Sequence, residues 1–226
     1  MNDFDHLMAL AFDHQGTLFD KHAVGGLIDE SSPGHGEAIA RAWFETIKQY
    51  CWLSGLMERH LTWAELTDRA LTYCVRAAGF DLDAALHTKL MDADLHLPPF
   101  PDVPDAQAHL SARSDVYVLS MASPSIIQES QRHAGVDGYF KKVISPERQK
   151  LYKPAPAAYN LCLEESGLPR EAVGFVSANS YDVIGGLNAG FTTFWINRAG
   201  GVLDELGLTP NFEVSDLAEL ATVLGA

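Results

Sequence analysis

The sequence has few cysteines and no long apolar run, and each shortage excludes a class of protein. Three cysteines, Cys51, Cys74 and Cys162, are too few and too scattered for a disulfide framework or a cysteine-based metal site. We interpret them as packing residues of a cytoplasmic protein. No run approaches the ~20 apolar residues that span a bilayer. The first residues, which include Asp3 and Asp5, lack the basic segment of a secretory signal.

Basic residues are also scarce, since 16 Lys and Arg face 30 Asp and Glu and give a formal charge of −14. Nucleic acids and anionic membrane surfaces bind to basic patches, so neither is an expected partner. An anionic substrate is still compatible with this charge, because one or two cations, hydroxyls and helix-start N–H groups make a local anion site. The 226 residues are enough for one large domain or a domain with a smaller insert.

A buried strand is predicted near the N-terminus. The apolar run over residues 7–12 is typical of a strand covered on both faces, and it ends at Asp13. Gly16 then allows a sharp turn, and Thr17 places a hydroxyl near the carboxylate. Ligands of parallel sheets bind beyond the carboxyl ends of the strands. The Asp-x-x-Gly-Thr pattern alone fits either a turn-capping Asp or a nucleophile.

The following stretch has a helical pattern and no comparable strand signal. Apolar residues recur at helical spacing from about residue 20 to 95. Thr62 is placed to cap one helix, and either Asp81 or Asp83 is placed to cap the next. We predict that residues 20–96 form an all-helical cap domain inserted after the first strand.

Beyond the proline-rich segment 98–104, short apolar strands alternate with helices. The strands are expected at residues 116–119, 142–144, 173–176 and 192–196. Such alternation indicates right-handed crossovers and a parallel sheet. We therefore predict an α/β fold with a doubly wound, Rossmann-like core, formed by residues 1–19 and 97–226.

Polar side chains follow the strands of this predicted sheet at one edge. They are Asp13, Thr17, Ser120, Lys153, Ser177, Asn179 and Asp182. Any one of them fits a helix cap or a solvated lysine. Their joint occurrence at the edge where parallel sheets bind ligands indicates an active site.

Several segments resemble the haloacid dehalogenase superfamily, and specifically its L-2-haloacid dehalogenase branch. They run from residue 10 to residue 214 and include AFDHQGTLFD, QYCWLSGLM, VLSMASP, YKPAPAAY, FVSANSYD and FWINRAGGVLDELG. The resemblance implies that Asp13 attacks C2 of a small carboxylic acid, expels a leaving group and forms an ester that water hydrolyses. It implies no cofactor, and it favours a homodimer because dimers are common in the family.

The resemblance also assigns roles to the other polar residues. Lys153 is expected to keep Asp13 ionised, and Asp182 to pair with Lys153 and help orient the hydrolytic water. Tyr159 matches a further active-site position. Ser120 and nearby backbone N–H groups correspond to the cradle of the substrate carboxylate. Thr17, Ser177 and Asn179 resemble the family's residues that position the carboxylates or the water.

One departure from the superfamily pattern concerns Gln15. Magnesium-dependent phosphatases of the superfamily carry a second Asp at this position, which protonates the leaving oxygen. An amide neither donates that proton nor supplies the negative charge, so we expect neither phosphatase activity nor a metal requirement. We include His14 and Gln15 among the substrate-binding candidates, and the sequence leaves their orientation open.

A second departure concerns the leaving group. In L-2-haloacid dehalogenases an Arg follows the tryptophan of the first insert helix and helps to hold the halide, whereas here Trp43 is followed by Phe44. The family's Asn after the strand-end serine is Met121. An aromatic wall attracts an ammonium group by about 0.5–2 kcal/mol and offers nothing comparable to a halide.

These departures lead to two interpretations of the reaction. The first is ring-opening hydrolysis of L-azetidine-2-carboxylate or a similar substrate, in which an amine leaves. The alternative is a conventional (S)-2-haloacid or haloacetate dehalogenase in which another residue serves the halide. A binding protein without activity is disfavoured because the nucleophile, the lysine and the Asn/Asp cluster are all present.

Overall fold

The computed structural model describes residues 3–226, and residues 1 and 2 of the predicted core domain lie outside the described residues. The chain forms two compact units. One consists of the residues up to Phe19 together with Pro99–Ala226, and the other of Asp20–Pro98.

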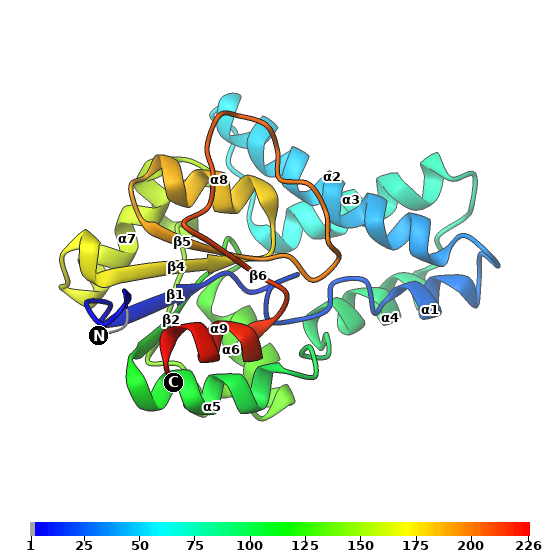
Figure 1. Cartoon of the computed structure of the whole chain (residues 1–226). Coiled ribbons are helices and arrows are strands. Elements are labelled where there is room, and N and C mark those ends of the chain that lie inside the picture. The colour runs from blue at the N-terminus through cyan, green and yellow to red at the C-terminus, as the bar shows by residue number, and fades with distance from the viewer. Residues whose placement is uncertain (1–2) are drawn as a thin grey trace. The chain divides into compact units, whose positions relative to one another are not determined.

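The first unit is built on a parallel sheet of six strands in the order β3-β2-β1-β4-β5-β6 (Figure 1). The strands are β1 (Ala9–Phe12), β2 (Asp115–Leu119), β3 (Lys142–Ile144), β4 (Val173–Ser177), β5 (Thr192–Ile196) and β6 (Phe212–Val214). All four residues of β1 are buried, as its continuous apolar run predicts. Strand order reverses around β1, which lies between β2 and β4. Asp13 therefore follows the strand at the topological switch point, where such sheets bind ligands.

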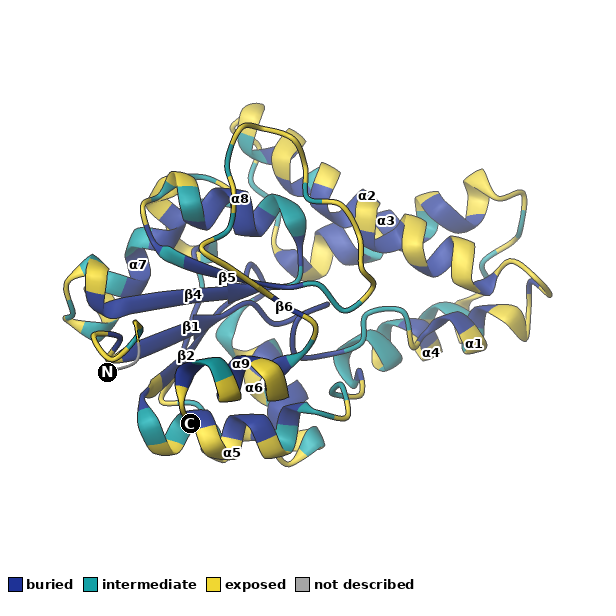
Figure 2. Cartoon of the chain, viewed as in Figure 1, coloured by how far each residue is buried: buried dark blue, intermediate teal, exposed yellow. Residues whose placement is uncertain are grey.

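Helices cover both faces of this sheet, which confirms the predicted doubly wound α/β fold (Figure 1). One face carries α5 (Val103–Arg113), α6 (Pro124–Ala134) and α9 (Leu217–Leu224), and the other carries α7 (Pro156–Ser166) and α8 (Ser180–Asn188). Short 3₁₀ turns occur at Asp137–Tyr139, Glu147–Gln149 and Arg170–Ala172. Figure 2 shows the strands β1, β4 and β5 as buried, so the core lies along the sheet.

The second unit is all-helical and consists of α1 (Gly25–Asp29), α2 (Gly36–Leu56), α3 (Trp63–Ala77) and α4 (Ala84–Leu95). Thr62 caps α3 in a reciprocal capping box with Glu65, as predicted. Asp83, not Asp81, caps α4, because its carboxylate accepts a hydrogen bond of 2.8 Å from the backbone N–H of Leu86.

Two elements have no counterpart in the sequence predictions. The strand β6 has three residues, of which only Val214 is buried, so it lacks an apolar run. The helix α1 begins at Gly25 without a side-chain cap, so neither a start signal nor a long periodic face marks it. The three cysteines are free and buried, which confirms their interpretation as packing residues. Within residues 3–226, no helix combines the length and apolar character needed to cross a membrane.

Candidate active site

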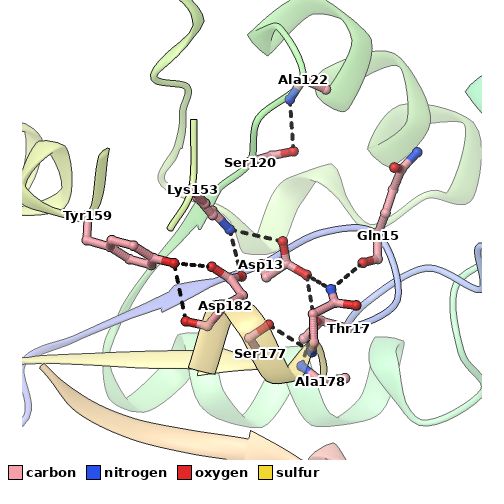
Figure 3. Close-up of polar contacts among 11 residues, drawn as sticks. Asp13, Gln15, Thr17, Ser120, Ala122, Lys153, Tyr159, Ser177, Ala178 and Asp182 are labelled. Atoms are coloured by element: carbon pink, nitrogen blue, oxygen red, sulfur yellow. Dashed lines mark hydrogen bonds and ion pairs between the residues drawn. The ribbon is translucent and has the colours of Figure 1, made fainter. Parts of the chain in front are cut away.

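The Asp13 carboxylate, which follows β1, is held by three side chains from three later parts of the chain (Figure 3). Its Oδ1 accepts a hydrogen bond of 3.0 Å from the Lys153 ammonium. Its Oδ2 accepts bonds of 2.8 Å from the Thr17 hydroxyl and 2.8 Å from the Asn179 amide. The residue is only 6% exposed, so these donors take the place of water around the carboxylate.

The donors to Oδ2 are themselves fixed by the backbone. The Thr17 hydroxyl accepts a bond of 2.8 Å from Ala178 N–H, which leaves its hydrogen for Asp13. The Asn179 amide also donates to the Gln15 carbonyl at 2.9 Å. Ser177 is fully buried, and its hydroxyl accepts a bond of 3.1 Å from Asn179 N–H, so it holds the start of α8 in place.

Lys153 bridges two buried carboxylates. Its ammonium donates to Asp13 at 3.0 Å and to Asp182 at 2.9 Å, and its side chain is completely buried. Burial alone lowers the pKa of Lys153, but the charges of Asp13 and Asp182 outweigh it and hold this pKa above the usual value. Burial raises the pKa of Asp182 to about 6, against the opposing pull of Lys153. At neutral pH Lys153 is therefore charged, and Asp182 is available as an anion.

Tyr159, on α7, completes the group around Asp182. Its hydroxyl donates to Asp182 Oδ1 at 2.7 Å, while Lys153 binds Oδ2. Burial, followed by the Asp182 charge, raises the pKa of Tyr159 well above its usual value, so the phenol stays protonated and remains a donor. A side chain on Gly185 would overlap the Tyr159 hydroxyl, so α8 needs glycine at this place.

Ser120 and Met121 lie at the neighbouring strand end, directly after β2. The Ser120 hydroxyl accepts a bond of 3.3 Å from Ala122 N–H, which directs its hydrogen away from the backbone. Met121 is buried and apolar. Both residues share the sheet edge of Asp13, and no described contact joins either side chain directly to the carboxylate.

His14 and Gln15 follow Asp13 directly, and their side chains have no role in holding it. Gln15 contributes its backbone carbonyl, and its side chain extends away from the Asp13 carboxylate (Figure 3). The His14 ring stacks on Phe19, with centroids 4.2 Å apart. Burial lowers the pKa of His14 to about 4, with Asp13 opposing the shift, so its imidazole is neutral at physiological pH.

The remaining two candidates lie on α2 of the helical unit. Trp43 is buried, and its indole N–H donates to the Thr67 carbonyl of α3 at 2.9 Å, which is a packing arrangement. The Lys21 ammonium lies 3.6 Å from the centroid of the Phe44 ring, and Lys48 lies 5.2 Å from it. The ring predicted to attract a substrate ammonium therefore already contacts cations of its own unit.

Sequence reasoning assigned no role to Arg198, although it follows β5 at the same sheet edge. Its guanidinium donates to the Thr17 carbonyl at 3.2 Å and to Asp102 at 2.9 Å, and it stacks over Phe100 at 4.2 Å. It thus fixes the turn that carries Thr17. The only available signal was its position after a strand, in a segment quoted for the family resemblance. The described residues 3–226 contain no cluster of three His, Cys, Asp or Glu side chains suited to a metal ion.

The buried Asp13 carboxylate lies at the switch point of a parallel α/β sheet. We compared the chain with known protein families. A model of haloacid dehalogenase-like hydrolases matches residues 7–190. The chain belongs to this family of hydrolases.

Its relatives carry more specific names. The chain is 41% identical over 214 residues to an (S)-2-haloacid dehalogenase of Pseudomonas sp. (strain YL), with 94% of this chain and 92% of the relative covered. It is 39% identical over 207 residues to haloacetate dehalogenase H-2 of Moraxella sp. (strain B), with 91% and 92% covered. It also resembles the structure of L-2-haloacid dehalogenase from Xanthobacter autotrophicus with covalently bound chloropropionic acid, at a TM-score of 0.90, 28% identity and 97% and 99% coverage.

These names bear on the two interpretations of the leaving group. The three similar proteins are named as dehalogenases of 2-haloacids or of haloacetate. None of the three names refers to azetidine-2-carboxylate. The comparisons therefore support the alternative, a conventional dehalogenase, better than they support ring opening.

Proposed function

We propose that this protein is an (S)-2-haloacid dehalogenase that hydrolyses small 2-haloalkanoic acids, haloacetates included, to 2-hydroxy acids and halide. The observation that carries the proposal is the Asp13 carboxylate, which is buried and held between Lys153, Thr17 and Asn179. The names of the similar proteins supply the substrate class. The main argument for an amine as leaving group was that the Phe44 ring would attract a substrate ammonium. The ring already contacts the ammonium groups of Lys21 and Lys48, so this argument no longer favours an amine.

In the first step one Asp13 oxygen attacks C2 of the substrate. Oδ2 accepts two hydrogen bonds, from Thr17 and Asn179, whereas Oδ1 accepts the bond from Lys153. These donors fix the orientation of the carboxylate toward the substrate. The attacking oxygen forms a bond to C2, and the carbon–halogen bond breaks with its electron pair on the halide. In-line attack inverts C2, so an (S)-2-haloacid gives an (R)-2-hydroxy acid.

In the second step water hydrolyses the ester at the Asp13 carboxyl carbon. Asp182 shares the Lys153 ammonium with Asp13, and it is held by Lys153 at 2.9 Å and Tyr159 at 2.7 Å. We assign it to orienting the water and accepting its proton. The carbon–oxygen bond to the Asp13 carboxyl carbon breaks, so one oxygen of Asp13 leaves with the product and an oxygen of water replaces it.

The substrate carboxylate needs donors near the attacked carbon. The Ser120 hydroxyl, at the end of β2, points its hydrogen away from Ala122 N–H and is suited to bind this group. The N-terminus of α6, which begins at Pro124, adds a favourable dipole at the same sheet edge.

Further parts of the proposal concern the whole protein. We infer that the helical unit acts as a cap that excludes water during the reaction. A homodimer is supported by large exposed apolar side chains at the end of α2 and on α3, namely Leu56, the adjoining Met57, and Tyr73. Light scattering of the purified protein tests it. A cytoplasmic location is supported by the free cysteines.

The decisive experiment offers four substrates separately: (S)-2-chloropropionate, chloroacetate, L-azetidine-2-carboxylate, and an aryl phosphate with Mg²⁺. We expect chloride release from the first two, (R)-lactate from the first, and turnover of neither of the others. Asp13→Asn should lower kcat by more than about 10³-fold because the amide is a poor nucleophile. Ring opening without chloride release would contradict the proposal.

Isotope labelling tests the ester separately. After repeated turnovers in H₂¹⁸O, mass spectrometry should find the label in the peptide that contains Asp13. A first turnover in the same water should give lactate with unlabelled C2 oxygen. Label in the first-turnover lactate would mean that water attacks C2 directly.

A further inference from the structure

Arg198 is a mostly buried cation that the proposed mechanism does not use, with 20% of its side chain exposed. It follows β5 and makes three contacts within the sheet-based unit. Its Nη2 donates to the Thr17 carbonyl at 3.2 Å, and its Nη1 donates to the Asp102 carboxylate at 2.9 Å. Its guanidinium carbon lies 4.2 Å from the centroid of the Phe100 ring. Two hydrogen bonds and a stacking contact therefore fix the guanidinium in one position.

Asp102 binds this arginine instead of capping its own helix. An Asp at the residue before a helix usually accepts a hydrogen bond from the first turn, but Asp102, which precedes α5, makes no such bond. Its Oδ2 instead accepts bonds from Arg198 at 2.9 Å and from the Leu217 N–H, at the start of α9, at 2.8 Å. Only 16% of its side chain is exposed. The guanidinium is thus held by a carboxylate that is itself anchored to α9.

The position of Arg198 is not explained by its own hydrogen-bonding needs. Its Nε is buried, and within residues 3–226 that atom has no hydrogen-bond partner. A buried donor without a partner is costly, and an apolar side chain of similar length would fill the same space without this cost. The arrangement therefore favours the bond to the Thr17 carbonyl over full satisfaction of the guanidinium.

The backbone of Thr17 is weakly held by its own turn. The N–H groups of Thr17, Leu18 and Phe19 all donate to the His14 carbonyl, at 3.3, 2.9 and 3.1 Å. A carbonyl oxygen has two lone pairs, so three donors share it, and the bond from Thr17 is the longest of the three. Arg198 binds the carbonyl of the same residue and so adds a fixed point to its backbone.

We propose that Arg198 is a positioning residue for the Asp13 nucleophile and that it acts through Thr17. This inference rests on the proposed dehalogenase function. The Thr17 hydroxyl donates to Asp13 Oδ2 at 2.8 Å (Figure 3), so a fixed Thr17 backbone keeps the carboxylate oriented for attack on C2. The guanidinium donates to Thr17 and Asp102 and not to Asp13, so its effect on the carboxylate is indirect.

A double-variant cycle tests whether Arg198 acts through the Thr17 hydroxyl. It compares Arg198→Met, Thr17→Val and the two combined, because valine keeps the shape of threonine and lacks the hydroxyl. The measured quantity is the rate constant of chloride release in the first turnover at saturating (S)-2-chloropropionate, which reports the attack by Asp13. We expect Arg198→Met to lower this rate constant about tenfold or more, and the half-saturating substrate concentration to change less than about threefold. In the Thr17→Val background, Arg198→Met should lower it less than about twofold.

Arg113 offers a matched control. Its Nη2 donates to the Phe4 carbonyl at 3.1 Å and lies 3.7 Å from the Asp5 carboxylate, and 18% of its side chain is exposed, so it resembles Arg198 in burial and bonding. It ends α5 ahead of β2, at the sheet edge opposite to Asp13. Arg113→Met should therefore lower stability and leave the rate constant as in the wild type.

Two outcomes of the cycle would overturn the proposal. One is an unchanged rate constant in folded Arg198→Met. The other is an equal loss from Arg198→Met with and without the Thr17 hydroxyl, which would mean that the guanidinium acts by its charge or by general support of the fold. If Arg198→Met does not fold, Asp102→Asn takes its place in the cycle, since it removes the charge that holds Arg198. Asp102→Asn should lower the rate constant about threefold or more, and this loss should disappear in the Thr17→Val background.

Hydrogen exchange provides a readout that needs no turnover. The N–H groups of residues 16–19 form the hydrogen bonds of the turn that follows Asp13. Peptides that cover residues 13–19 should exchange faster in Arg198→Met than in the wild type and in Arg113→Met. Equal exchange in all three proteins would overturn the proposal. A failure of the proposed function appears differently, as no chloride release by the wild type, and the exchange measurement then still decides whether Arg198 holds the turn.

Discussion

At the scale of single residues, the site depends on one cation placed between two carboxylates. Lys153 contacts Asp13 at 3.0 Å and Asp182 at 2.9 Å, and all three side chains are buried. Two carboxylates at such positions repel each other and lose their hydration, and the ammonium between them offsets both costs. Lys153 thus supports both Asp13, the proposed nucleophile, and Asp182, the group proposed to orient water.

Replacement of this cation should harm activity and stability in a pH-dependent way. In Lys153→Met we expect kcat/KM to fall by more than about 10³-fold and the free energy of unfolding to fall by about 3–5 kcal/mol at pH 8. The pKa of Asp182 is already raised to about 6 in the folded protein, and it rises further when the opposing charge of Lys153 is removed. Stability is then lost as pH rises through the folded pKa values, so the deficit should shrink at pH 5.

Guanidinium unfolding of the wild type and Lys153→Met at pH 5 and pH 8 measures this effect. Lys141→Met is the matched control, because Lys141 pairs with Asp115 at the surface with 56% of its side chain exposed. The control should change stability by less than about 1 kcal/mol. The same deficit for Lys153→Met at both pH values would mean that lost packing, not charge, causes it.

The sequence predicted the residues of this site better than it predicted their contacts. Asp13, Lys153 and Asp182 were identified because polar groups after parallel strands share one edge, and the structure brings these three into direct contact. The two oxygens of Asp13 have different donors, and this depends on backbone positions that no spacing encodes. Arg198 was missed because its partner Thr17 lies 181 positions away in sequence.

At the scale of elements, the helix α8 carries the Asp182 carboxylate and leaves room for the Tyr159 hydroxyl that binds it. Asp182 lies in its first turn, and Gly185 lies one turn later beneath the Tyr159 hydroxyl. Glycine lowers helix propensity by about 1 kcal/mol relative to alanine, so its presence within a nine-residue helix costs stability. Glycine is needed here despite this cost, because the Tyr159 hydroxyl lies where a larger residue would place its Cβ.

A methyl group at Gly185 should push α8 and the Tyr159 side chain of α7 apart. In Gly185→Ala the new Cβ displaces the Tyr159 hydroxyl, so Asp182 loses one donor. We expect kcat to fall about tenfold or more, and stability to fall by about 1–3 kcal/mol despite the better helix propensity. Steady-state kinetics and thermal unfolding test this, with Gly138→Ala as control, since a Cβ at Gly138 meets nothing within 4 Å. Full activity in Gly185→Ala would show that the contact between Tyr159 and Asp182 is dispensable.

Element prediction succeeded where burial leaves a strong pattern. The strands β1, β2, β4 and β5 are buried over four or five residues and appear as apolar runs in the sequence. The edge strand β6 is exposed at two of its three residues, so its sequence resembles a loop. Its position follows from pairing with β5, which is a tertiary effect that local sequence does not show.

At the scale of the whole molecule, the buried titratable groups impose a pH dependence that the net charge of −14 does not reveal. His14 and Asp182 have folded pKa values of about 4 and about 6, and they act in opposite directions. A raised carboxyl pKa gives stability that is lost as pH rises, whereas a lowered histidine pKa gives stability that is lost as pH falls. The contribution of each group is therefore visible only in a comparison with a variant.

His14→Leu isolates the histidine contribution. Between pH 6.5 and about 4 the unfolded chain protonates this histidine while the folded protein keeps it neutral, so the unfolded state binds more protons and stability rises with pH in this window. A shift of this size corresponds to roughly 3 kcal/mol across the window. The wild type should therefore lose more unfolding free energy than His14→Leu between pH 7 and pH 4. Gln107→Met, which removes a buried side chain that does not titrate, should follow the wild type, and parallel curves for all three proteins would mean that His14 is protonated alike in both states.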